Sequence, residues 1–185
     1  MNKTPVLNLF GGPGIGKSTI ASGVFSLLKQ HGINCELVTE FAKDLTWECR
    51  KKTLLNQRYI FGKQYHRQWR VRDEVDVIIT DSPLLLGIYY NSDTLSDFFV
   101  RDVIVAWNEF DNINFFLNRV KPYNPKGRNQ KEEEAIIIDN ELKILLNTKG
   151  EDYKIVDGDY TGINIITREM LSTFDMEIKI RFEEY

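Results

Sequence analysis

The amino-acid sequence predicts an α/β protein in which helices cover both faces of a five-stranded parallel sheet. Short apolar runs alternate with longer segments of helical periodicity, which is the pattern of successive β-α-β units. The runs at residues 6–10 and 75–80 are predominantly apolar, as strands buried on both faces are. A chain of 185 residues has the size of one domain with one core, so we expect a single domain over residues 1–185.

The first elements follow from periodicity and from the residues that end helices. A strand over residues 6–10 leads through a glycine-rich turn into a helix with apolar residues at helical spacing, and Gly32 is placed to end that helix. A second strand over residues 35–39 ends in Glu40. Residues 41–73 are then expected to be helical, in two pieces.

The same alternation continues to the C-terminus. We expect further strands over residues 75–80, 113–117 and 153–156, and helices over residues 84–91, 94–110 and 163–174. Another helix begins at Glu132, Glu133 and Glu134, because carboxylates in a first turn complement the helix dipole. In the C-terminal tail, residues 174–185, apolar and polar residues alternate, which favours a short terminal strand at an edge of the sheet.

Residues 11–18 match the pattern G-x-x-x-x-G-K-[ST], and residues 11–19 are called the phosphate loop below. Glycines let the backbone fold around phosphates with its N–H groups pointing inward, and the next helix adds positive potential at its N-terminus. Lys17 is expected to reach the β- and γ-phosphates, and the Ser18 hydroxyl to bind Mg²⁺. The expected nucleotide-binding residues here are Gly11, Gly12, Pro13, Gly14, Ile15, Gly16, Lys17, Ser18 and Thr19. The motif predicts a nucleoside triphosphate site, although it specifies no reaction.

Further short motifs follow in order: a carboxylate after the second strand, DSP at residues 81–83, GR at residues 127–128 and GDY at residues 158–160. Together with GGPGIGKST they resemble the P-loop nucleoside and nucleotide kinases, most of all the small NadR-like kinases and ATPases that are common in phage genomes. The resemblance covers residues 5–168. It implies a three-layer P-loop NTPase fold like that of nucleoside monophosphate kinases, strand order 2-3-1-4-5, ATP as phosphoryl donor and a lid near residues 119–131.

The resemblance assigns roles to two carboxylates at strand ends. Asp81 matches a residue near Mg²⁺ and the triphosphate, where a carboxylate beside the loop can hold the metal or its waters. Glu40 matches the residue that takes the proton of the acceptor hydroxyl, which requires that it lie in hydrogen-bond reach of that hydroxyl. The role of base is open between the two. The alternatives are a turn opener at Asp81 and a surface glutamate before a helix at Glu40.

Two later segments match the lid and the nucleotide-base loop of these kinases. In the lid, Arg119 and Arg128 are the expected catalytic arginines, because phosphoryl transfer depends on electrostatic stabilisation by groups that close over the phosphates. The alternative for this stretch is a solvated basic loop. After the fifth strand, Gly158, Asp159 and Tyr160 match the loop that packs against adenine.

The region that binds the acceptor in these kinases is locally basic. Between Glu48 and Asp73 no residue is acidic, and eight are basic: Arg50, Lys51, Lys52, Arg58, Lys63, Arg67, Arg70 and Arg72. Aromatic residues such as Tyr59 and Trp69 are interleaved with them. Positive charge beside aromatic rings suits a nucleotide, or single-stranded or modified DNA, bound through residues 50–72. The alternative is an amphipathic helix with a basic solvent face.

Three functions are compatible with these residues. The first is an ATP-dependent kinase acting on a nucleoside or nucleotide. The second is a kinase acting on a hydroxyl within DNA or RNA, either a terminal hydroxyl or a hydroxymethylated base. The third is a nucleotide-dependent switch or ATPase without a phosphoryl acceptor. Neither the acceptor nor the oligomeric state follows from the sequence.

Composition bears on the cellular location and the partners that we expect for this protein. The net charge of −3 gives no overall attraction to nucleic acid or anionic membranes. No apolar run approaches the roughly 20 residues of a membrane helix, and the N-terminus lacks the apolar core of a signal peptide. We therefore expect a cytoplasmic protein without a membrane partner, in the host cytoplasm if phage-encoded. Cys35 and Cys49 form no metal-spaced cluster and are expected to be reduced.

Overall fold

The computed structural model describes residues 3–90, 96–124 and 131–183, without the side chains of residues 175–183. Within this part of the chain, five parallel strands form one sheet in the order β2-β3-β1-β4-β5. The strands are β1 (Pro5–Phe10), β2 (Cys35–Val38), β3 (Val77–Thr80), β4 (Asp111–Asn118) and β5 (Lys154–Asp157). The predicted parallel sheet and its order are confirmed.

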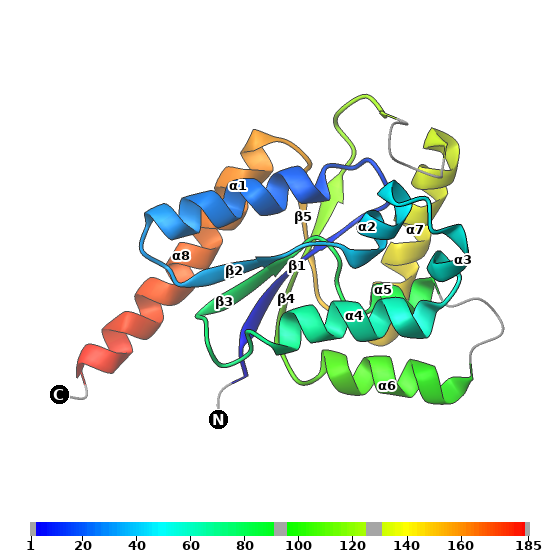
Figure 1. Ribbon diagram of the computed structural model, residues 1–185. Helices are drawn as coiled ribbons and strands as arrows, with labels where there is room; N and C mark the ends of the chain where they lie inside the picture. Colours follow the sequence, from blue (N-terminus) through cyan, green and yellow to red (C-terminus); the bar gives the residue numbers. More distant parts are fainter. Residues whose placement is uncertain (1–2, 91–95, 125–130, 184–185) are drawn as a thin grey trace.

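The long helices lie on both faces of this sheet (Figure 1). The helices are α1 (Lys17–Gln30), α2 (Phe41–Trp47), α3 (Lys51–Leu54), α4 (Gln57–Trp69), α5 (Leu86–Tyr89), α6 (Asp97–Trp107), α7 (Glu132–Lys149) and α8 (Tyr160–Glu183). Helices α1 and α8 pack on one face, whereas α4, α6 and α7 cover the other. Among the helices described, none combines the length and apolarity needed to cross a membrane.

The central strand β1 contributes alternate side chains to two apolar clusters. Val6 and Phe10 pack toward α6 and α7, where Phe10 meets the ring of Trp107 edge-on. Leu7 and Leu9 pack toward α1 and α8 on the opposite face. All four strand residues are fully buried, so β1 is fixed from both sides. The phosphate loop, which begins at its end, therefore starts from a rigid support.

The segment over residues 41–73 forms three helices, where the sequence predicted two. Helix α2 ends before Cys49, an exposed residue with a left-handed φ of 57°. Helix α4 starts after Asn56, whose side chain accepts a hydrogen bond from the N–H of Tyr59. Neither break contains a glycine or proline, so the usual signals for a helix end were absent.

The C-terminal tail is helical, and the predicted terminal strand is wrong. Helix α8 begins at Tyr160 instead of residue 163 and continues through the tail to Glu183. No glycine or proline follows Phe174, and methionine, glutamate, lysine and arginine are all good helix formers. The helix therefore meets no residue that would end it, and the short apolar-polar alternation does not outweigh this propensity.

The carboxyl ends of three neighbouring strands meet at one edge of the sheet, because the strands are parallel. At this edge β1 runs into the phosphate loop, β2 leads through Thr39 to Glu40, and β3 is followed by Asp81. Ligands of parallel α/β proteins bind beyond this edge. The topology therefore brings the predicted site residues of three separate segments to one place.

Candidate functional site

The glycines of the phosphate loop adopt backbone angles that other residues avoid. The φ values of Gly11, Gly14 and Gly16 are 139°, 79° and 111°, within the region that favours glycine. Helix α1 begins at the next residue, Lys17, and its first turn contains no acidic residue. The free N–H groups at the start of α1 therefore present positive potential at the loop, as anion binding requires.

Lys17 lies across the phosphate loop. Its ammonium group donates hydrogen bonds to the carbonyl oxygens of Gly11 at 2.5 Å and Gly12 at 3.1 Å. Burial lowers the pKa of Lys17, and the nearby carboxylates of Glu40 and Asp81 oppose that shift. A partly desolvated cation is thus held at the point where the motif places the terminal phosphates.

Glu40 and Asp81 are in contact through the backbone. Asp81 is buried, and its Oδ1 accepts a hydrogen bond of 2.9 Å from the N–H of Glu40. Burial raises the pKa of Glu40, while the Lys17 ammonium counteracts the rise. Ser18 follows Lys17 in the first turn of α1, so a hydroxyl and two carboxylates, which are oxygen ligands of the kind Mg²⁺ takes, share this edge.

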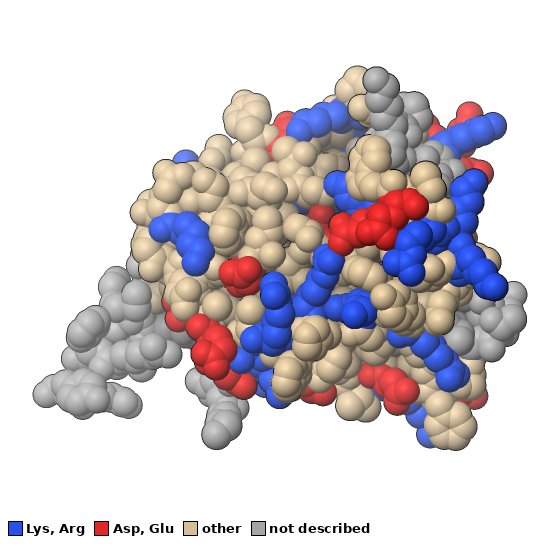
Figure 2. All heavy atoms as spheres, in the orientation of Figure 1, with Lys and Arg blue, Asp and Glu red and all other residues tan. Residues whose placement is uncertain are grey.

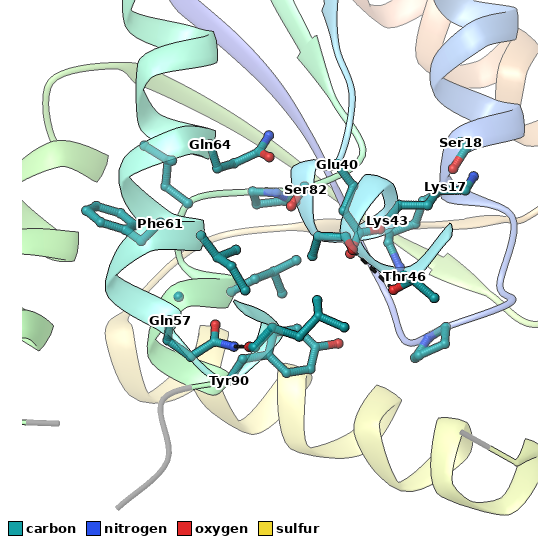
Figure 3. A pocket seen from close by; sticks show the side chains of 18 of the residues that line it. Lys17, Ser18, Glu40, Lys43, Thr46, Gln57, Phe61, Gln64, Ser82 and Tyr90 are labelled. Atoms are coloured by element: carbon teal, nitrogen blue, oxygen red, sulfur yellow. Dashed lines mark hydrogen bonds between the residues drawn. The ribbon is translucent and has the colours of Figure 1, made fainter. Parts of the chain in front are cut away.

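A cavity of about 470 Å³ opens beside the phosphate loop (Figure 3). Lys17, Ser18 and Glu40 line one end of it. The walls away from the loop come from α2, α3, α4, α5 and the turns next to them. Their labelled side chains include Lys43, Thr46, Gln57, Phe61, Gln64 and Tyr90. The cavity therefore joins the expected position of the terminal phosphates to a chamber lined by aromatic, amide and hydroxyl groups.

Gln64 is a buried polar residue of this wall that sequence reasoning did not identify. Its Oε1 accepts a hydrogen bond of 3.0 Å from the N–H of Phe41, and its Nε2 lies 3.4 Å from the carbonyl oxygen of Thr39. These contacts hold the backbone on both sides of Glu40. The available signal was weak, because the buried residues of α4 are two glutamines, Gln64 and Gln68, that lie on the helix among apolar residues such as Phe61.

The two predicted lid arginines have different outcomes. Arg119 lies outside the cavity, and its guanidinium binds Asp139 of α7 at 2.9 Å and the carbonyl oxygen of Pro13 at 3.1 Å. It therefore contacts the phosphate loop at Pro13, and its role in transfer stays a prediction. Arg128 lies outside the described residues. Asp139 is buried within α7 and was not identified from the sequence.

The loop after β5 packs directly on the phosphate loop. A Cβ atom added to Gly158 would lie 2.4 Å from the carbonyl oxygen of Ile15, so only glycine fits there. Asp159 accepts hydrogen bonds from the N–H and hydroxyl of Thr161 at the start of α8, and these bonds lower the pKa of Asp159. Tyr160 is 73% exposed, so its side chain is free to meet a ligand.

The eight basic residues between Arg50 and Arg72 do not line the cavity, and basic side chains gather on the surface around α3 and α4 (Figure 2). Three of the eight form ion pairs within the described residues, namely Arg50 with Glu48, Arg67 with Asp44 and Arg72 with Glu109. The outward face of α4 carries an open hollow of about 490 Å³ that is lined by Arg58, Tyr59, Gly62, Lys63 and His66. The helix thus presents one face to the cavity and a basic face to solvent.

A sheet in the order β2-β3-β1-β4-β5, with a glycine-rich turn and Lys17 at the end of β1, defines the P-loop NTPase fold. A family model described as "AAA domain" matches residues 6–161. The chain therefore belongs to this family of AAA domains.

Comparison with other proteins adds a likeness in fold. No curated protein matches the chain. The structure of deoxyadenosine kinase from M. mycoides with bound dATP is similar, with 20% sequence identity, a TM-score of 0.51, and 89% of this chain and 98% of that chain covered. The crystal structure of APE1195 shares 19% identity at a TM-score of 0.44, covering 93% of this chain and 97% of that one. The likeness to the deoxyadenosine kinase supports the P-loop NTPase fold.

Proposed function

We propose that this protein is a kinase that transfers the γ-phosphoryl group of ATP to a hydroxyl of a nucleoside or nucleotide. The observation that carries the proposal is the cavity of about 470 Å³, which runs from Lys17 and Glu40 to a chamber lined by Phe61, Gln57 and Gln64. An acceptor in this chamber has its hydroxyl beside the expected γ-phosphate. A nucleotide-dependent switch without an acceptor has no use for such a chamber.

The roles proposed for the phosphate side follow from charge. Lys17 and the N-terminus of α1 stabilise the negative charge of the triphosphate. Ser18 and Asp81 supply a hydroxyl and a carboxylate that would hold Mg²⁺, and the ion, when bound, would neutralise charge on the phosphate oxygens. Gly158, Asp159 and Tyr160 lie where the loop after β5 reaches the phosphate loop, and we assign them to the adenine side.

On the acceptor side, Glu40 is the proposed base. The acceptor oxygen attacks the γ-phosphorus, its proton passes to the Glu40 carboxylate, and the bond from the γ-phosphorus to ADP breaks. Burial raises the pKa of Glu40, which makes its carboxylate a better proton acceptor than an exposed one. Asp81, whose Oδ1 binds the N–H of Glu40, fixes the position of that residue.

The chamber itself favours a small, planar acceptor. Phe61 offers an aromatic surface, and Gln57, Gln64 and Tyr90 offer hydrogen-bonding groups without formal charge. Lys43 is the cation in the wall besides Lys17 among the described residues, so one phosphate on the acceptor is compatible with the lining. These features suit a nucleoside or a nucleoside monophosphate.

A second candidate, a kinase that acts on a hydroxyl within DNA or RNA, is favoured by the outward face of α4. Tyr59, Lys63, His66 and Arg70 recur at helical spacing along that face. The Lys63 ammonium lies 5.6 Å from the centre of the Tyr59 ring, and His66 stacks on Trp69. Cations beside exposed rings are the features with which proteins bind single strands.

Transfer of label from γ-labelled ATP tests both candidates. The acceptors are nucleosides including nicotinamide riboside, nucleoside monophosphates, and plain or base-hydroxymethylated oligonucleotides, each with Mg²⁺. We expect label on a nucleoside or monophosphate, and a loss of roughly 100-fold or more in Glu40→Gln, in line with removal of a general base. The Lys17→Ala protein is the inactive control, and Glu48→Gln, which alters an exposed glutamate, is the matched active control.

Label on oligonucleotides alone would select the second candidate instead. Label released only as free phosphate, with every acceptor in the panel, would contradict both kinase assignments and favour a nucleotide-dependent switch.

A further inference from the structure

The backbone of the phosphate loop is hydrogen-bonded to a carboxylate that lies far away in the sequence. Asp139, in the middle of α7, accepts a hydrogen bond of 2.5 Å at Oδ1 from the N–H of Gly12. A Cβ atom on Gly12 would lie 2.6 Å from the carbonyl oxygen of Ala135. Glycine at this position therefore allows α7 to approach the loop closely enough for the contact.

The other oxygen of Asp139 links the loop to Arg119. Asp139 Oδ2 accepts from Nη2 of Arg119 at 2.9 Å and from Nε at 3.2 Å, and Nη1 of the same guanidinium donates to the carbonyl oxygen of Pro13 at 3.1 Å. Both side chains are 12% exposed. The pair thus binds the N–H of one loop residue and the carbonyl oxygen of the next.

Stability alone does not account for a charged pair at this place. Buried ion pairs are often replaceable by apolar residues of similar volume without loss of stability, because desolvation offsets their attraction. Asp139 also follows Ala135 and precedes Leu142 along the buried stripe of α7, where an apolar residue would otherwise pack. What the pair contributes beyond packing is the fixed geometry of two loop peptides.

The same network extends to the lysine of the motif. Lys17 donates to the carbonyl oxygen of Gly11, and the N–H of the same peptide unit, which belongs to Gly12, binds Asp139. Asp139 and Arg119 both act on Lys17 electrostatically, with opposite signs. A change at Asp139 therefore reaches the phosphate-binding groups through one peptide unit.

We propose that Asp139 is a positioning residue for nucleotide binding, which acts through Gly12 and Arg119 to hold the phosphate loop in its anion-binding form. The inference rests on the proposed function in one respect, namely that the loop binds ATP. Asp139 itself does not line the cavity. In the protein without this carboxylate, the loop loses one charge-assisted hydrogen bond and Arg119 loses its partner.

The test measures binding of a fluorescent ATP analogue, mant-ATP with Mg²⁺, to folded protein. We expect Asp139→Asn to raise the Kd by roughly tenfold or more, the factor that corresponds to losing one hydrogen bond to a charged group. With Asp139→Asn saturated by ATP, the KM for the acceptor is expected to stay at the wild-type value. Glu169→Gln, which breaks the solvent-exposed pair with Lys154 at 2.6 Å, is the matched control and leaves the Kd unchanged.

A double-mutant cycle separates positioning from general destabilisation. If Asp139 and Arg119 act as one unit, Arg119→Met and Asp139→Asn together raise the Kd no more than the larger single effect. Circular dichroism at the assay temperature establishes that each variant is folded. If Asp139→Asn does not fold, Arg119→Lys carries the test, because lysine keeps the charge but loses the forked contact with Asp139 and Pro13.

Two results would overturn the inference while leaving the proposed function intact. One is wild-type affinity for mant-ATP in folded Asp139→Asn. The other is tighter binding in that variant, which would mean that Asp139 withholds Arg119 from the nucleotide. Failure of the proposed function is distinct: transfer of label to no acceptor would contradict the kinase assignment, while mant-ATP binding and the inference stand. Equally weak binding of mant-ATP by wild type and Lys17→Ala would instead contradict both, because the loop would then bind no ATP.

Discussion

Glu40 is the residue whose protonation state matters most for the proposed chemistry. Its carboxyl lines the cavity, lies close to Lys17, and is desolvated enough that burial raises its pKa. The folded protein therefore binds this proton more tightly than the unfolded chain does. The contribution of Glu40 to stability is fully present below the ordinary pKa of glutamate and is lost as the pH rises through the raised value.

The raised pKa of Glu40 leads to a prediction about how stability depends on pH. Glu40→Gln removes the buried charge, so we expect its Tm to exceed that of wild type at about pH 8, and the gain to disappear near pH 4, where glutamate is protonated in both states. Thermal unfolding followed by circular dichroism at the two pH values measures this. A gain that is equal at both would show that the burial of charge is not its cause.

Gly158 gives a second prediction at the scale of single residues. A Cβ atom there would lie 2.4 Å from the carbonyl oxygen of Ile15 and 2.9 Å from that of Asn118. We expect Gly158→Ala to destabilise the fold by about 1–3 kcal/mol, as overpacking does, and to weaken ATP binding by displacing the phosphate loop. Denaturant unfolding and mant-ATP titration measure the two effects.

Gly62 provides the matched control for this substitution. An added Cβ atom at Gly62 would meet no atom within 4 Å, and the residue lies inside α4. Gly62→Ala is therefore expected to stabilise the protein by roughly 0.5–1 kcal/mol, the helix propensity difference between the two residues. Equal effects at the two glycines would contradict the close packing of the loop after β5.

Sequence reasoning could predict that candidate site residues which are contiguous, or which end strands, lie together at one edge of the sheet. The phosphate loop is a continuous motif, and Glu40 and Asp81 follow apolar strands, so local pattern was sufficient. Asp139 and Gln64 were missed because their partners are distant: 127 positions separate Asp139 from Gly12. In the sequence, this carboxylate is one polar residue within an apolar stripe. Its partner becomes evident only when α7 packs on the loop.

At the scale of elements, α8 shows where local pattern was misleading. The predicted helix over residues 163–174 is contained within an observed helix that runs from Tyr160 to Glu183. Strands β1 and β3 were well predicted because buried parallel strands are apolar throughout. The break near Cys49 was missed because no sequence signal marks a left-handed cysteine. Asn56, by contrast, is a residue type that caps helices, and this signal for the start of α4 was overlooked.

Two neighbouring isoleucines of α8 test how this helix packs. Ile166 is fully buried in the cluster with α1, whereas Ile165 is 50% exposed. We expect Ile166→Ala to lower the free energy of unfolding by about 2–5 kcal/mol, and Ile165→Ala to change it by no more than about 0.5 kcal/mol. Denaturant titration measures both. Comparable losses would mean that α8 docks with a different face.

At the scale of the whole molecule, one sheet separates two apolar clusters. Because β1 contributes to both clusters, loss of either layer removes support from the other. The single-domain organisation stays a prediction, and it requires one cooperative transition in denaturant. Tryptophan fluorescence and far-ultraviolet circular dichroism should give coincident curves. Two separated transitions would contradict it.

The outward face of α4 predicts salt-sensitive binding to single strands. With about three phosphate contacts, the logarithm of the binding constant should fall with the logarithm of salt concentration with a slope of roughly −2. Lys63→Gln combined with Arg70→Gln should reduce the slope, whereas Lys29→Gln, on α1 at the opposite face of the sheet, should not. Fluorescence anisotropy of a labelled oligonucleotide measures this. If no oligonucleotide binds at low salt, the basic face of α4 is only a solvated surface and the second candidate function is contradicted.

The strand order and the meeting of three strand ends were predictable, because the phosphate-loop motif and the sequence of short motifs together indicate one fold. The acceptor chamber was not. Its walls come from α2, α3, α4, α5 and their turns, which each contribute one or a few side chains, among them Gln57, Phe61 and Tyr90. Helical spacing puts Gln57 and Phe61 on one face of α4, but no spacing rule relates them to residues of the other helices, so the chamber becomes visible only after the helices are packed.

The two cysteines differ in a way that has a practical use. Cys35 is fully buried, and burial raises the pKa of its thiol, whereas Cys49 is exposed at the turn after α2. A maleimide dye should therefore attach to the unmodified protein at one position. That position is two residues from Trp47, which lines the chamber. A fluorescent dye on Cys49 of the wild-type chain could therefore report binding of the acceptor in the chamber.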